Sequence, residues 1–254
     1  MKNKIFFKLS YFVALVFLSL PFLNFALRYD FLVLSNLNPA LIWASLRVSL
    51  VSSFISMVVV ILVGIPAGYY MARSTFRFKS VLDSLLNLPQ ILPPAVIGLL
   101  LLFTYGNHGF IGQQLARLGI RTSFSSLAVM LTFVFVSLPL FINGCSLAFS
   151  KVDPELEQTA ALLGDDARKV FFRISLPLAK KGILVSLLMA WSRGLAEFGA
   201  TMMFAGNLPG VTQTLPLAIF SALETNVHHA LFLSFIMFII AGIVLVSVHF
   251  LSKE

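Results

Sequence analysis

The stretch EQTAALLGDDARKVFFRISLP (157–177) is polar and charged, although the chain around it consists of long apolar runs. It falls within residues 150–181, the longest internal hydrophilic stretch. An amphipathic linker lying on a bilayer has this composition, and so does a surface that binds a partner protein. Composition alone does not separate the two interpretations, so the order of the residues has to decide between them.

Helix-forming and helix-ending residues punctuate this region. Asp153 can cap a helix, Pro154 suits its first position, and Gly164 can end it. Asp165 can cap a second short helix, which Pro177 ends or bends. The sequence therefore predicts two short helices joined at a glycine.

The whole chain has the composition of an integral membrane protein. Of its 254 residues 59% are hydrophobic and 11% are charged, and the mean hydropathy is +0.96, whereas a soluble domain carries about 25% charge. A membrane span needs about 20 mostly apolar residues. We expect a single transmembrane domain over 1–254 with six spans, at about 9–27, 48–72, 84–104, 124–149, 182–204 and 230–251.

The first apolar stretch follows Lys2, Lys4 and Lys8, as in a signal peptide. It is long for the apolar region of such a peptide, and no convincing small-x-small cleavage site follows before Arg28. We therefore expect it to be a retained first helix.

Lysine and arginine predict the orientation. With the N-terminus and C-terminus in the cytoplasm, thirteen of these residues lie inside and four outside, as the positive-inside rule favours. The net charge of +8 is thus read as a topology signal and not as a nucleic-acid surface. The four outside residues are Arg28, Arg47, Arg117 and Arg121.

Spacing within the opening stretch resembles the EAA loop of ABC importer permeases, whose pattern is E-A-A, three residues, G, nine residues, I, one residue, L-P. The matching positions are Ala160, Gly164, Ile174, Leu176 and Pro177. Gln158 stands where the family has Glu, and Thr159 where it has Ala. Glu157, one place earlier, can partly supply the missing charge.

Three further blocks extend the resemblance over most of the chain: LPQILPPAVIG (88–98), AWSRGLAEFGATMMFAGNLPG (190–210) and TQTLPLAIFSAL (212–223). They look like the permeases of molybdate importers, with sulfate and tungstate permeases as close relatives. The resemblance implies an all-helical type I ABC importer permease in the cell inner membrane. Two copies would form the pathway, two ATPase subunits would dock beneath them, and an external binding protein would deliver the anion.

Segment 156–164 would then be the coupling helix. Its small residues let a partner surface approach closely, and the basic residues after it can meet partner carboxylates or lipid phosphates. The chain has no G-x-x-x-x-G-K-[ST] phosphate loop, so ATP and Mg²⁺ are expected on the partner, and no enzyme activity, cofactor or metal is expected here. The expected coupling residues are Glu157, Gln158, Thr159, Ala160, Ala161, Gly164, Arg168 and Arg173.

Arg193 and Glu197 are charged residues inside the fifth predicted span, spaced i, i+4, so they can pair on one helix face. An unpaired charge at the bilayer centre costs about 2.5–3.5 kcal/mol on insertion scales. The two residues are either a structural ion pair or part of the pathway or its gate. Other pathway candidates supply donors, close helix approach or a kink, with ordinary helix packing as the alternative: Gly199, Thr201, Asn207, Thr212, Thr214, Pro93 and Pro94.

Molybdate is the expected cargo, with tungstate or sulfate and thiosulfate as alternatives on the same architecture. A secondary oxyanion transporter driven by an ion gradient is a more distant alternative, and it needs ion-coupling carboxylates in the membrane. Glu197 is the only good candidate for one. A membrane scaffold that transports nothing would not need a charged pair within a span.

Overall fold

The computed structural model describes residues 2–28 and 39–253, and throughout these residues the regular structure is helical, without strands. The chain divides into two units, residues 1–38 and 39–254. The first unit contains α1 (Lys2–Arg28), whose segment Phe6–Phe25 is apolar and long enough to cross a bilayer. This helix contains the predicted first span.

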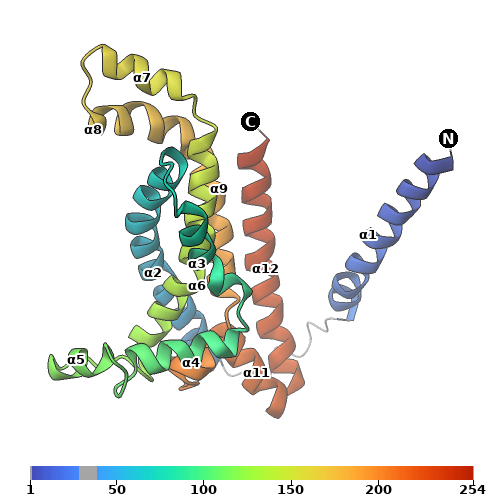
Figure 1. Cartoon of the computed structure of the whole chain (residues 1–254). Helices are drawn as coiled ribbons and strands as arrows, with labels where there is room; N and C mark the ends of the chain where they lie inside the picture. Colours follow the sequence, from blue (N-terminus) through green and yellow to red (C-terminus); the bar gives the residue numbers. More distant parts are fainter. Residues whose placement is uncertain (1, 29–38, 254) are drawn as a thin grey trace. The chain divides into compact units, whose positions relative to one another are not determined.

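The second unit contains the remaining elements. They are α2 (Pro39–Arg73), α3 (Lys79–Ile91), α4 (Pro94–Tyr105), α5 (Gly112–Arg117), α6 (Ser126–Ser150), α7 (Pro154–Leu162), α8 (Ala167–Val170), the π-helical turn η2 (Phe171–Ser175), α9 (Leu176–Leu195), α10 (Gly199–Ala205), α11 (Leu215–Thr225) and α12 (Val227–Ser252). Within this unit α2, α6, α9 and α12 run side by side, α7 and α8 project from one end, and α4 and α11 lie across the other (Figure 1).

Helix α6 lies between α2 and α9 and packs against both. Glycines allow the close approach: a Cβ on Gly68 would lie 2.5 Å from the Cβ of Cys145, and one on Gly182 would lie 2.7 Å from the Cβ of Ala148. Small residues are favoured at helix contacts in membranes for this reason. Cys145 is free and buried, as expected of a packing residue.

Helices α2, α6 and α12, together with the helical run Ala167–Leu195, are also long and apolar enough to span. A sixth span is obtained if α3 and α4 are counted as one. The predicted span at 84–104 is bent, as its prolines suggested, because α3 and α4 meet at 111°. Leu92 and Pro93 are extended at this bend, since a residue before a proline disfavours helical backbone and Pro93 and Pro94 follow in succession.

The predicted fifth span, 182–204, also needs correction at both ends. The helical run begins at Ala167 and passes through η2 into α9, with Pro177 in the first turn of α9, so Pro177 does not end the helix. In η2 the N–H of Leu176 bonds to the carbonyl of Phe171, the i to i−5 pattern of a π turn. At the other end α9 stops at Leu195, and α10 is a separate helix.

Candidate functional site: the α7–α8 loop and the α9–α10 break

The α7–α8 loop forms from residues that act within their own turns. The carboxylate of Asp153 accepts a hydrogen bond from the N–H of Glu155 at 2.9 Å, and Pro154 occupies the first turn of α7. Gly164 follows the helix with φ of +98°, a left-handed conformation that glycine adopts without a Cβ penalty. These predictions are confirmed. The cap of α8 is Asp166, whose carboxylate accepts from the N–H of Lys169, and not the predicted Asp165.

Most of the predicted coupling residues lie on the outer surface of this loop. Ala160 is buried within the chain, and Glu157 is mostly covered. A nitrogen of the Arg173 guanidinium in η2 lies 3.9 Å from the carboxylate of Asp165, which lies between α7 and α8, and the pair is largely exposed. The exposed members of the predicted set are Gln158, Thr159, Ala161, Gly164, Arg168 and Arg173.

Two leucines missing from the predicted set are the most exposed apolar residues of the loop. Leu162 is 89% exposed and Leu163 is 84% exposed. Apolar side chains grouped on a surface mark a contact with a protein or a membrane. The signal was present in the sequence, because these leucines stand together at the end of a polar helix, directly before its terminating glycine.

The carboxylate of Glu157 is bound inside the chain. It forms an ion pair with Arg73 at the end of α2, with a nitrogen–oxygen distance of 2.8 Å, and it accepts a hydrogen bond from the hydroxyl of Ser175 at 2.7 Å. Burial by itself raises the pKa of Glu157, but the hydrogen bonds from Arg73 and Ser175 and the charge of Arg73 outweigh burial and hold this pKa below its ordinary value.

The predicted pair of Arg193 and Glu197 is confirmed at the α9–α10 break. Arg193 Nη1 lies 2.7 Å from Glu197 Oε2, while Glu197 Oε1 accepts a hydrogen bond from the N–H of Ala200 at 3.0 Å. The prediction that both lie in one continuous span is wrong, because Glu197 lies between the two helices. Glu197 is 2% exposed, whereas the side chain of Arg193 is 40% exposed.

Two predicted pathway residues meet beside this break. A Cβ on Gly199 would lie 2.8 Å from the Cβ of Pro94, so the starts of α10 and α4 are in contact. Pro93 immediately precedes α4. Thr201 on α10 is fully buried, and its hydroxyl has no hydrogen-bond partner within the described part of the chain. The break thus brings a buried carboxylate and a buried hydroxyl onto one short segment.

The other predicted pathway residues lie in the loop from α10 to α11. The amide of Asn207 donates to Ser221 at 2.8 Å and accepts from Gln213 at 3.0 Å. The hydroxyl of Thr212 accepts from the N–H of Leu208. Thr214 is buried, and its hydroxyl lacks a partner among the residues described. Gln213 and Ser221 were not predicted, because their roles arise from folding of the loop onto α11.

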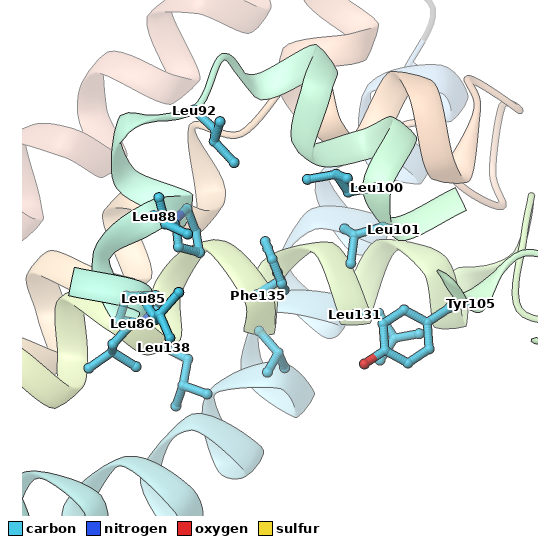
Figure 2. Close-up of a pocket in the computed structure, with 13 residues that line it drawn as sticks. Leu85, Leu86, Leu88, Leu92, Leu100, Leu101, Tyr105, Leu131, Phe135 and Leu138 are labelled. Carbon is cyan, nitrogen blue, oxygen red and sulfur yellow. The ribbon is translucent and has the colours of Figure 1, made fainter. Parts of the chain in front are cut away.

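An apolar cavity of about 470 Å³ lies between α3, α4 and α6. Figure 2 shows lining leucines of α3 and α4 on either side of the bend, with Phe135 of α6 between them. No charged side chain lines it, so the cavity does not have the chemistry of an anion site.

Comparison with known proteins identifies the architecture. Residues 64–252 match the family described as binding-protein-dependent transport system inner membrane component. The chain belongs to this family. Family membership makes the protein a multi-pass transport component of the inner membrane and not an enzyme.

Individual proteins to which the chain is similar are also transport permeases or ABC transporters. The molybdenum transport system permease protein ModB of Escherichia coli K12 is 41% identical over 184 residues, which cover 72% of this chain and 80% of that protein. ModB of Mycobacterium tuberculosis is 35% identical over 239 residues, covering 92% and 89%. In fold, the chain is similar to a bacterial alginate ABC transporter solved with its periplasmic protein, with a TM-score of 0.66, 16% identity and coverage of 98% and 93%.

Proposed function

We propose that this chain is the membrane-spanning subunit of an ATP-driven importer for molybdate. The observation that supports molybdate as the cargo is the 41% identity over 184 residues with the molybdenum permease of Escherichia coli. Two copies of the chain enclose the anion pathway, two cytoplasmic subunits bind ATP and Mg²⁺, and an external binding protein delivers the anion. ATP binding opens the anion pathway between the two copies to the outside, and hydrolysis reverses the motion.

The α7–α8 loop is the part that docks on the ATP-hydrolysing subunit in this proposal. Its support is the exposure of Leu162 and Leu163 at the tip, together with the polar exposed side chains of Gln158 and Thr159 beside them. An apolar centre with a polar rim is the usual composition of a protein interface. Arg168 in α8 is also exposed and can meet a partner carboxylate.

The pathway runs past the α9–α10 break and the loop before α11. Among the described residues, Thr201 and Thr214 are two of the three buried hydroxyls without a hydrogen-bond partner, the third being Ser137, and they can donate to an oxyanion. Hydroxyl donors suit transport because they bind an anion without a deep charge trap, from which it would not leave. Arg193 adds one partly exposed cation, which Glu197 balances.

Anion competition tests the cargo. The chain would be purified with its ATP-hydrolysing subunit and binding protein, and molybdate, tungstate and sulfate would compete for stimulation of ATP hydrolysis. We expect molybdate to stimulate at a lower concentration than sulfate. An equal or stronger response to sulfate or tungstate contradicts molybdate as the cargo. Uptake that needs no ATP-hydrolysing subunit supports the ion-gradient alternative.

Leu162→Ser with Leu163→Ser tests the docking surface. Because these side chains would fill the centre of the interface, we expect the double variant to retain at most about a tenth of the bound ATP-hydrolysing subunit after gel filtration. Leu118→Ser is the matched control, since Leu118 is 75% exposed but lies after α5, away from the α7–α8 loop. Equal loss of the subunit in both proteins argues against docking through the leucines.

A further inference from the structure

Glu157 makes contacts with two elements outside its own helix. Arg73 Nε of α2 donates to Glu157 Oε2 at 3.0 Å, and Arg73 Nη2 donates to Oε1 at 2.8 Å, so the pair is bidentate. Ser175 of η2 donates to Oε1 at 2.7 Å. The same Arg73 Nη2 also donates to the carbonyl of Val152, just before α7, at 2.9 Å. One carboxylate therefore joins α7 to the end of α2 and to the helical run that continues into α9.

The surroundings of this ion pair restrict its movement. The side chains of Arg73 and Glu157 are 19% and 12% exposed, so both are largely shielded from water. Bidentate arginine–carboxylate pairs fix the orientation of both groups as well as adding energy. Removal of one partner from such a shielded pair leaves the other charge without compensation.

Three aromatic rings pack beside the ion pair and come from the same part of the bundle. The ring of Tyr69 on α2 lies 5.2 Å from that of Phe149 on α6 and 5.0 Å from that of Phe171 in η2, both edge to face. The hydroxyl of Tyr69 lies 3.5 Å from Glu157 Oε2. Edge-to-face ring pairs have a preferred geometry, so the ends of α2 and α6 and the start of the α9 run form one packed joint around Glu157.

We infer that Glu157 is a positioning residue that ties α7 to α2 and η2, so that a displacement of α7 by a docked partner moves the membrane helices with it. The inference rests on the proposed function, because the displacement comes from the ATP-hydrolysing subunit. It assigns Glu157 an internal role and leaves contact with the partner to the outer surface of α7. The joint transmits motion because its members belong to helices that continue into the membrane.

Charge removal on α7 provides the test and its matched control. Glu157→Gln removes the charge from the joint, while Glu155→Gln removes a charge from an exposed residue two positions away on the same helix. Arg73→Gln removes the other partner, and Arg73→Lys keeps the charge without the bidentate geometry. Each variant would be purified with the ATP-hydrolysing subunit and binding protein and reconstituted in vesicles.

Three measurements separate positioning from partner contact: the amount of bound ATP-hydrolysing subunit, the stimulation of ATP hydrolysis by binding protein loaded with molybdate, and amide hydrogen exchange in residues 154–162. For Glu157→Gln and Arg73→Gln we expect normal assembly, stimulation reduced at least about fivefold, and faster exchange in α7. Arg73→Lys should fall between these variants and wild type, and Glu155→Gln should match wild type.

Several results would overturn the inference. Wild-type stimulation in Glu157→Gln would show that transmission does not need the joint. Loss of the bound subunit with unchanged exchange would place Glu157 in the partner interface. If Glu157→Gln fails to fold, Arg73→Lys decides, and wild-type stimulation in that variant would count against the inference. Failure of the proposed function would be visible separately, as ATP-independent uptake by the wild type.

Discussion

Glu197 binds two different groups with its two carboxylate oxygens, Arg193 through Oε2 and the N–H of Ala200 through Oε1. Glu197→Ala removes both contacts, while Glu197→Gln keeps an oxygen for the N–H and loses the charge. We expect the alanine variant to lose about 1–2 kcal/mol of stability, as when a side-chain hydrogen bond to an N–H at a helix N-terminus is lost, and the glutamine variant to lose less. Thermal unfolding in detergent measures both variants, and equal losses would show that the charge of Glu197 matters more than its hydrogen bond with the N–H of Ala200.

Glu157 predicts a pH dependence whose sign follows from its lowered pKa. The folded protein holds this pKa below the ordinary value of 4.5, so the unfolded chain binds the proton more tightly. The stabilisation by the carboxylate is therefore complete above about pH 4.5 and is lost as the pH falls through the folded pKa. We expect the melting temperatures of wild type and Glu157→Gln to differ at pH 7 and to converge as the pH falls below 4.5 and through the folded pKa. A difference that widens on acidification would contradict this sign.

At the scale of elements, the sequence predicted what neighbouring residues determine. Asp153, Pro154 and Gly164 act within their own turns, so the bounds of α7 could be inferred from local patterns. The contact between Arg73 and Glu157 could not, because 84 residues separate them. The α9–α10 break carries no proline, and it depends on packing of Gly199 against α4 and on the hydrogen bond from the N–H of Ala200 to Glu197. Pro93 and Pro94 predicted a kink but not its angle of 111°.

The contact between α4 and α10 predicts an effect of volume at Gly98. A Cβ there would lie 2.6 Å from the Cβ of Met203 and 2.7 Å from the carbonyl oxygen of Ala200, so Gly98→Ala must push the two helices apart. We expect a loss of about 1–3 kcal/mol, as for other overpacked sites. Gly242→Ala on α12 is the control, because a Cβ at Gly242 has open space around it. Melting temperatures compare the two, and a stable Gly98→Ala variant would show that α10 can shift freely.

At the scale of the whole 39–254 unit, several helix ends and basic residues lie together at the end that carries α7 and α8. The ends of α2 and α7 are joined by the contact between Arg73 and Glu157. The end of α12 belongs with them, since Leu251 lines a groove with Asp153 and Leu156. Lys151 also lines this groove, so Arg73 and Lys151, two of the predicted cytoplasmic charges, lie at the α7–α8 end of this unit. This arrangement supplies a structural reason for the predicted orientation, because positive charge favours the cytoplasmic side.

Reporter fusions test that orientation. A fluorescent protein fused after residue 254 is expected to fluoresce, and alkaline phosphatase at the same position to be inactive, because the end of α12 lies with the α7–α8 loop. Insertion of either reporter at Gly210, an exposed glycine in the loop between α10 and α11, should give the reverse. Gly210 suits an insertion because it is exposed and a Cβ there would meet nothing within 4 Å. Phosphatase activity at the C-terminus together with fluorescence at Gly210 would invert the topology and place the α7–α8 loop outside, where it could not reach an ATP-hydrolysing subunit.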